Sequence, residues 1–141
     1  MKKINIQFLA ILFIAAIFTS CGSNMFNGVV GNRNIVTIER TSQADFSGIK
    51  VSTGIDLFIS EGSMNAITVG EDENLHDLII KKVKEDVLKI YTDKNIWKAK
   101  ARRINVNIGN LTLLKASRGS NVKSESIIDT NEIYIDASSG A

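Results

Sequence analysis

The residues best suited to chemistry in this 141-residue chain form a basic segment around its only tryptophan, Trp97. No acidic residue follows Asp93 within this segment, whose cationic residues are Lys94, Lys98, Lys100, Arg102 and Arg103. Cationic and aromatic groups together can bind an anionic glycan, a lipid head group or nucleic acid. The alternative is a solvated connecting loop whose tryptophan covers the end of the domain core. We favour the covering role and keep the binding role as the second hypothesis.

Acidic residues surround the only histidine, His76, and they are Glu71, Asp72, Glu73 and Asp77. Carboxylate oxygens are the ligands that calcium prefers, but the spacing is not that of a known calcium loop. A charged turn, with His76 on a solvated polar edge, is the preferred interpretation. A Ser-His-Asp triad or a two-histidine metal site would have to be built around this one histidine. We therefore expect no enzymatic activity, no bound metal and no cofactor.

The only cysteine, Cys21, follows a segment typical of protein export. Two lysines near the start precede an apolar run of eleven residues, Phe8–Phe18. A membrane-spanning helix needs about 20 apolar residues, so this run fits the core of an export signal instead. The sequence Phe18-Thr19-Ser20-Cys21 resembles a bacterial lipobox, although leucine usually stands at the position of Phe18. We predict a lipoprotein signal peptide over residues 1–20 and lipidation of Cys21, with ordinary cleavage and a free thiol as the alternative.

Removing residues 1–20 changes the charge of the chain and leaves 141 − 20 = 121 residues, enough for one domain. All 15 acidic residues remain and 17 − 2 = 15 basic residues remain, so the mature chain is formally neutral. Net charge therefore gives no support to a nucleic-acid partner. Residues 21–34 are mostly small and polar, which predicts a flexible tether before a domain that spans residues 35–141.

Alternation of apolar and polar residues predicts an all-β domain, and the chain contains no proline. Strands are expected at Ile35–Ile38, Val51–Ser60, Asn65–Val69, Leu88–Tyr91 and Ile104–Ile108. A hairpin is expected at Lys84-Glu85-Asp86.

One segment, Glu73–Val83, also has apolar residues at helical spacing, with Asp72 placed as an N-cap. Both a short helix and a strand remain open there.

A repeated segment indicates how the strands are stacked. Leu114–Ser120 returns as Ile135–Ala141 at a constant offset of 135 − 114 = 21 residues. A fixed period near twenty is typical of stacked repeats, in which neighbouring coils bury one another's apolar side chains. In this arrangement Lys115 lies beside Asp136 on the outer surface. The inward positions are Thr112, Leu114 and Ala116 in one coil and Ile133, Ile135 and Ala137 in the next.

Several motifs, in this order, resemble the auto-transporter adhesin "head GIN" domain family over residues 38–141. They are Arg40, Phe46–Val51, Gly54–Gly62, Val69–Leu75, Val87–Ile90 and the two Ala-Ser-x-Gly turns. The resemblance implies a right-handed β-helix similar to pectin-lyase-type solenoids, a presumed role in adhesion and no catalytic set. The chain has no literal Gly-Ile-Asn, so no role is transferred to that tripeptide. The alternative fold is a β-sandwich.

These observations favour a lipid-anchored protein of the bacterial envelope, at the outer membrane or cell surface, whose domain binds a glycan or a protein surface. The alternatives are a β-helical polysaccharide-active enzyme and a structural or regulatory envelope protein without a ligand. Ala141 falls at the turn of a repeat, so we expect an incomplete solenoid. An open last coil has a bare strand edge and is expected to self-associate.

Overall fold

A computed structural model describes residues 28–141 of the protein, except residues 42, 43 and 64. The predicted signal peptide, Cys21 and the first part of the predicted tether lie outside the described residues. In the part of the chain that is described, no helix is long and apolar enough to cross a membrane.

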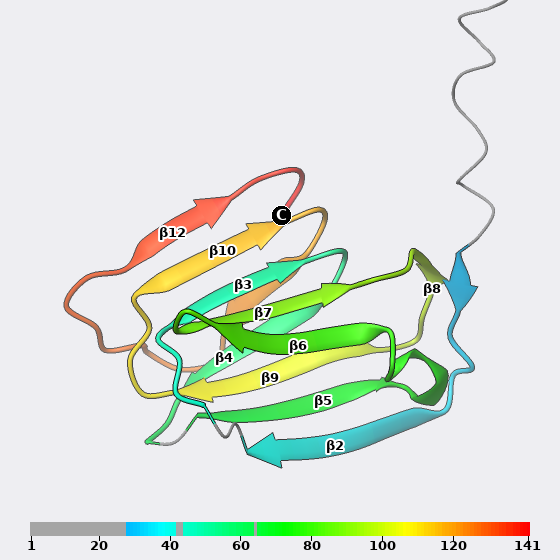
Figure 1. Ribbon diagram of the computed structural model, residues 1–141, viewed down its shortest axis with the longest axis horizontal. Coiled ribbons are helices and arrows are strands. Elements are labelled where there is room, and N and C mark those ends of the chain that lie inside the picture. Colours follow the sequence, from blue (N-terminus) through cyan, green and yellow to red (C-terminus); the bar gives the residue numbers. More distant parts are fainter. Residues whose placement is uncertain (1–27, 42–43, 64) are drawn as a thin grey trace, which may run out of the picture.

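The described chain is all-β, as predicted, and most of its strands belong to two five-stranded sheets (Figure 1). Sheet I has the strand order β12-β10-β3-β7-β6 and sheet II the order β11-β4-β9-β5-β2, while β1 and β8 pair separately. The elements are β1 (Val29–Val30), β2 (Ile35–Thr41), β3 (Gly48–Ser52), β4 (Asp56–Glu61), β5 (Ala66–Asp72), η1 (Glu73–Leu75), β6 (Ile79–Lys84), β7 (Val87–Thr92), β8 (Ile96–Lys98), β9 (Arg102–Ile108), β10 (Leu113–Ser117), β11 (Asn121–Ser124) and β12 (Tyr134–Ala137).

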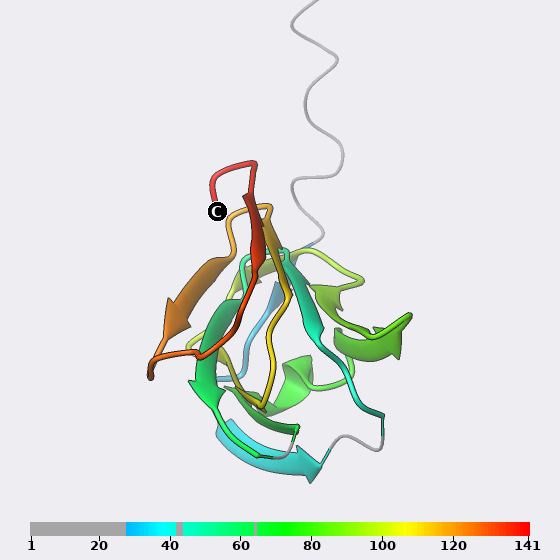
Figure 2. The same ribbon diagram turned by 90° about the vertical axis from the view of Figure 1, so that its left-hand side faces the viewer.

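The two sheets face each other across one apolar core, an arrangement that fits the β-sandwich alternative (Figure 2). Within the sheets, β7, β3, β10 and β12 are parallel, and so are β9, β4 and β11. Strands β2, β5 and β6 add antiparallel pairs at the other end. Alternate residues of the strands supply the core: Ile49, Val51, Leu57, Ile59, Leu88, Ile90, Ile104, Val106 and Ile108. Each such burial is worth about 1.5–3 kcal/mol relative to an exposed side chain.

The prediction of one strand over Val51–Ser60 is wrong, because the chain turns a corner inside it. Thr53 and Gly54 both have positive φ, 71° and 67°, and this left-handed pair takes the chain from sheet I to sheet II. The same corner recurs at Arg118-Gly119 and Ser139-Gly140. The backbone N–H of Gly54 donates to the carbonyl of Arg118, and that of Gly119 to the carbonyl of Ser139, so the corners are stacked.

The register inferred from the 21-residue repeat is confirmed. Leu114 pairs with Ile135 and Lys115 with Asp136, and the Lys115 Nζ lies 3.5 Å from an Asp136 carboxylate oxygen. Strand β3 is a third copy that the repeat did not identify, since Leu114 also pairs with Ile49 on its other side. The stack therefore does not follow chain order: β3 and β4 lie between the β7/β9 and β10/β11 strands.

The ambiguous segment Glu73–Val83 contains one turn of 3₁₀ helix, η1, followed by strand β6. Asp72 occupies the N-cap position of η1, as predicted, but its side chain makes no capping hydrogen bond. Its Oδ2 instead accepts a hydrogen bond from the backbone N–H of Lys100 at 3.0 Å. The predicted hairpin at Lys84-Glu85-Asp86 is confirmed as the β6–β7 turn.

Residues 28–34, which were expected to belong to the tether, pack on the domain. Strand β1 pairs with β8, and the backbone N–H of Gly31 donates to the carbonyl of Lys98 at 2.7 Å. The Asn74 side chain bonds both to Val30 and to Asn32. These contacts fix where the chain joins the domain, next to β8.

We predict that Gly31→Ala loosens this attachment. A Cβ at Gly31 would lie 1.8 Å from Asp72 Oδ2, and Asp72 is fully buried and bonded to Lys100. Forcing an atom into such a site costs about 1–3 kcal/mol. Denaturant unfolding would measure the loss of stability, and amide hydrogen exchange at Val29 and at position 31 should become faster. The control is Gly70→Ala, whose Cβ would meet only one carbonyl at 3.8 Å; equal behaviour of the two variants would contradict the prediction.

Candidate functional site

Most of the basic segment predicted from the sequence lines a groove beside β1 and β8, which we call the basic groove. It has a volume of about 650 Å³. Four cationic residues and one tryptophan line it together with small residues, and no acidic residue is among the described residues of its wall. The lining residues are Val30, Gly31, Arg33, Trp97, Lys98, Ala99, Lys100 and Arg102. This composition suits an anionic ligand.

Trp97 lies on the outer side of β8 and is 63% exposed, so the prediction that it covers the end of the core is wrong. Its neighbour Ile96 is 8% exposed and belongs to the core. Strand alternation explains the difference, because adjacent side chains point to opposite faces. The Lys98 Nζ lies 5.7 Å from the Trp97 ring centroid, and Gly28 packs so closely that a Cβ there would lie 2.7 Å from Trp97 Cβ.

The structure separates Arg103 from the other candidates. Its Nη2 lies 2.6 Å from a carboxylate oxygen of Glu125, and its guanidinium covers the Phe58 ring at 3.7 Å. Arg102, on the other side of β9, lies over the corner glycine, Gly54. Lys94 is exposed but does not line the groove.

Arg33 joins the basic groove from the N-terminal segment, and sequence reasoning missed it. It lies 98 − 33 = 65 residues before Lys98, and only the pairing of β1 with β8 brings the two together. Its positive φ of 64° marks a turn, which the small and polar residues around it signalled.

A buried carboxylate lies next to this groove. Asp72 is fully buried and accepts from the backbone N–H of Lys100, which lines the groove. One buried negative charge beside four cationic side chains leaves the surface with a net positive charge. The groove can therefore hold an anion by charge and by the face of Trp97, whereas it offers no set of ligands to a metal cation.

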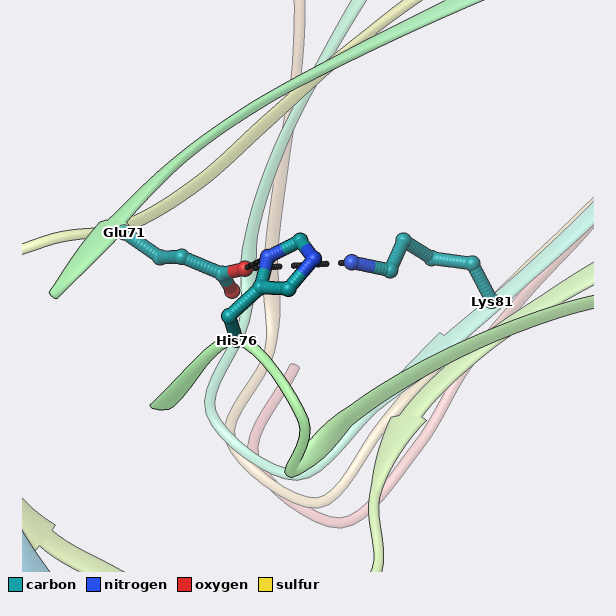
Figure 3. Close-up of polar contacts among 3 residues, drawn as sticks. All are labelled: Glu71, His76 and Lys81. Atoms are coloured by element: carbon teal, nitrogen blue, oxygen red, sulfur yellow. Dashed lines mark hydrogen bonds and ion pairs between the residues drawn. The ribbon is translucent and has the colours of Figure 1, made fainter. Parts of the chain in front are cut away.

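His76 is part of a largely buried polar cluster with Glu71 and Lys81 (Figure 3). Its Nδ1 lies 2.6 Å from Glu71 Oε1, and the Lys81 Nζ lies 3.8 Å from the same oxygen. The expected place of His76 on a solvated edge is wrong, since its side chain is only 21% exposed and contacts a fully buried carboxylate. Within the described residues, no three His, Cys, Asp or Glu side chains form a group suited to a metal ion.

An apolar concavity lies at the end of the stack formed by β12 and β11, and we call it the open end. Its volume is about 580 Å³, and its walls include Leu114, Val122, Ile128, Ile133 and Ile135. Among the described strands, β12 and β11 are edge strands of their sheets. Ile135 belongs to the inward series but is 62% exposed, because no described strand covers it. At the opposite end, the connection from β5 to β6 crosses between the sheets and buries Leu75 in the core.

Comparison with known families confirms the resemblance inferred from the motifs. Residues 45–141 match the family described as "Putative auto-transporter adhesin, head GIN domain". The comparison with curated proteins found no match.

Several solved structures have a similar fold. A "putative adhesin" from Parabacteroides merdae ATCC 43184 shares 27% identity over 78% of this chain, with a TM-score of 0.70. Two proteins from Parabacteroides distasonis ATCC 8503, a "putative adhesin" and a "putative lipid binding protein", share 19% and 22% identity over 80% and 79% of this chain, with TM-scores of 0.63 and 0.64. The chain covers 46%, 57% and 49% of these three proteins, about half of their length.

Proposed function

Because this chain belongs to the auto-transporter adhesin, head GIN domain family, we propose that it is an adhesion or ligand-binding protein of the bacterial cell envelope. In this proposal the protein is exported through residues 1–20 and anchored by lipid on Cys21, at the outer membrane or cell surface. The short apolar run and the lipobox-like sequence before Cys21 support the anchor. The family description supports adhesion as the role of the domain.

We further propose that the parallel strands follow a right-handed β-helical path. The parallel pairing of β7, β3, β10 and β12 and the three stacked corners support this path. Right-handed crossovers are also the strong rule for parallel strands that belong to one sheet. Such a path leaves a stack with two different ends, of which one carries the apolar concavity.

The proposed binding role depends on the open end of the stack. It combines exposed apolar side chains with the edges of β12 and β11, which pair on that side with no other strand of the described residues. Only a polypeptide strand satisfies both, since an apolar small molecule would leave the N–H and C=O groups of β12 without partners. The partner we propose is a second copy of this chain. A copy related by a two-fold axis brings the same edge and the same apolar surface, so one patch serves both sides.

We expect Ile135→Lys to abolish this self-association. A charge at this exposed lining residue of the open end would have to be desolvated in the dimer, but it remains in water in the monomer. Sedimentation of the mature chain, residues 21–141, should show a concentration-dependent dimer, and the variant should stay a folded monomer. The matched control is Ile127→Lys, at an isoleucine that is also exposed but lies outside the cavity wall.

Two outcomes would overturn the dimer. One is a wild-type chain that stays monomeric at high concentration. The other is a monomer that takes up a fatty acid in a way that Ile135→Lys prevents. The second outcome would indicate lipid binding. The apolar wall of the concavity and the description of one P. distasonis neighbour as a "putative lipid binding protein" are the reasons to test for it.

The two remaining classes of function are separated by binding and turnover assays. A glycan array probed with the mature domain should show a specific ligand if the protein is an adhesin, and none if it is purely structural. Release of products from polysaccharides would indicate a β-helical enzyme. The cationic and aromatic side chains of the basic groove favour acidic glycans as the first class to test.

A further inference from the structure

We infer that the basic groove docks the domain onto the anionic head groups of the membrane that carries the lipid anchor. This inference rests on the proposed lipidation of Cys21. The membrane-facing surface consists of Arg33, Trp97, Lys98, Lys100 and Arg102.

The distance between the anchor and the groove is bounded by the sequence. Gly28 is the first described residue and lies 28 − 21 = 7 residues after Cys21. Seven residues span at most about 25 Å even when fully extended. Gly28 packs directly against Trp97, so Trp97 lies within about this distance of the lipid-bearing residue.

Hydrogen bonds hold the first described residues against the strand that carries Trp97. The Val29 N–H donates to the carbonyl of Asn95 at 2.8 Å, and Gly31 N–H donates to that of Lys98 at 2.7 Å. The Asn34 side chain donates to Glu73 at 2.8 Å. Residues 29–34 are therefore held along β8 and η1, and Figure 1 shows β1 beside β8. Val30, Gly31 and Arg33 of this segment line the basic groove. The groove therefore lies beside Gly28, the described residue that is nearest in sequence to the proposed anchor.

The chemistry of the groove matches a membrane surface better than a soluble ligand. Lys98 and Lys100 are exposed, and the groove's four cationic side chains lie close together, as head-group binding requires. Trp97 is mostly exposed on the same surface, and tryptophan is enriched at the interface between membrane and water. A lipid anchor together with a basic surface is also a recognised combination of two membrane signals. A free acidic glycan would explain the charges but would not require them beside the anchored end of the chain.

The test uses the mature chain, residues 21–141, carrying Cys21→Ser, mixed with vesicles of phosphatidylglycerol or of phosphatidylcholine. Because Trp97 is the only tryptophan, its fluorescence reports directly on the groove. We expect a blue shift and flotation with phosphatidylglycerol, reversal of both by high salt, and neither with phosphatidylcholine. The double variant Lys98→Gln/Lys100→Gln should bind about 25-fold more weakly, since each cation near an anionic surface is worth about fivefold in affinity.

Lys82→Gln/Lys123→Gln is the matched control, because it removes the same charge at exposed lysines of β6 and β11. Equal losses in the two double variants would overturn the inference, as would a Trp97 emission that does not respond to phosphatidylglycerol. Binding of a soluble acidic polysaccharide that exceeds binding to vesicles would reassign the groove to glycans.

A second arm separates this inference from the proposed anchor. The lipidated wild-type chain in vesicles should show quenching of Trp97 by brominated lipids. If the lipidated chain shows no quenching, the docking inference is wrong and the proposed anchor still stands. If the chain is never lipidated but binds phosphatidylglycerol through Lys98 and Lys100, the proposed anchor is wrong and the groove is still a membrane-binding surface.

Discussion

Cells that produce the Cys21→Ser chain are expected to lose it from the membrane fraction. Each buried CH₂ of an acyl chain contributes about 0.8 kcal/mol to membrane binding, and more than one chain gives stable anchoring. Serine cannot receive the thioether-linked lipid, so the whole of this contribution is lost. Detergent partitioning and the intact mass of the protein measure the change. Any association that remains through the basic groove should be removed by salt.

The control for this prediction is Ser23→Ala, which changes a small residue beside the site and keeps the cysteine. That variant should keep both the mass increase and the membrane location. A Cys21→Ser chain that still partitions with detergent and keeps the mass increase of the wild type would show that Cys21 is not the lipidated residue.

Glu71→Gln is expected to destabilise the domain by about 3 kcal/mol. The Glu71 carboxylate is fully buried and holds both the His76 ring at 2.6 Å and the Lys81 ammonium at 3.8 Å. Removing its charge takes the counter-charge from a lysine whose side chain is only 12% exposed. Thermal unfolding should therefore shift down by at least about 10 °C. Denaturant unfolding should give the same loss of free energy.

The matched control is Glu85→Gln at the β6–β7 turn. Glu85 lies 3.7 Å from Lys84, but both side chains are well exposed, so the change should cost between about 0 and 1 kcal/mol. A double-mutant cycle of Glu71→Gln with Lys81→Met provides the second check. The double variant should be more stable than the sum of the two single losses. Strictly additive losses would mean that the two groups do not interact.

The strands were predictable where side chains alternate, and less so where the backbone turns. Ile104, Val106 and Ile108 were assigned correctly because alternation alone decides which residues of β9 are buried. The alternation of polar and apolar residues continues through Thr53-Gly54 and therefore predicts one strand over Val51–Ser60. The positive φ of both residues makes a corner there. The Ser-x-Gly pattern shared with Ser117-Arg118-Gly119 was the signal that could have located it.

The candidate site was predictable only in part. The basic segment was identified from composition, yet alternation along β9 sends Arg102 to the groove and Arg103 to the opposite side, where it pairs with Glu125. The exposure of Trp97 could have been inferred from Ile96, because adjacent residues of a strand point to opposite faces and Ile96 is the one that is buried. The position of His76 could not, because its partner Glu71 is a carboxylate that becomes fully buried only when the domain folds.

The sequence by itself determined the all-β class, the family and the 21-residue register of β10 on β12, because these depend on local alternation and on a repeat within one stretch of chain. Tertiary structure alone decided that β3 lies between β7 and β10, and that Arg33 meets Lys98. Both results depend on which strand edges pair across long stretches of chain, from 87 − 48 = 39 residues for β3 with β7 to 96 − 29 = 67 residues for β1 with β8. That choice follows from the packing of the whole core and from the burial of Asp72 beneath Gly31, which no local pattern contains.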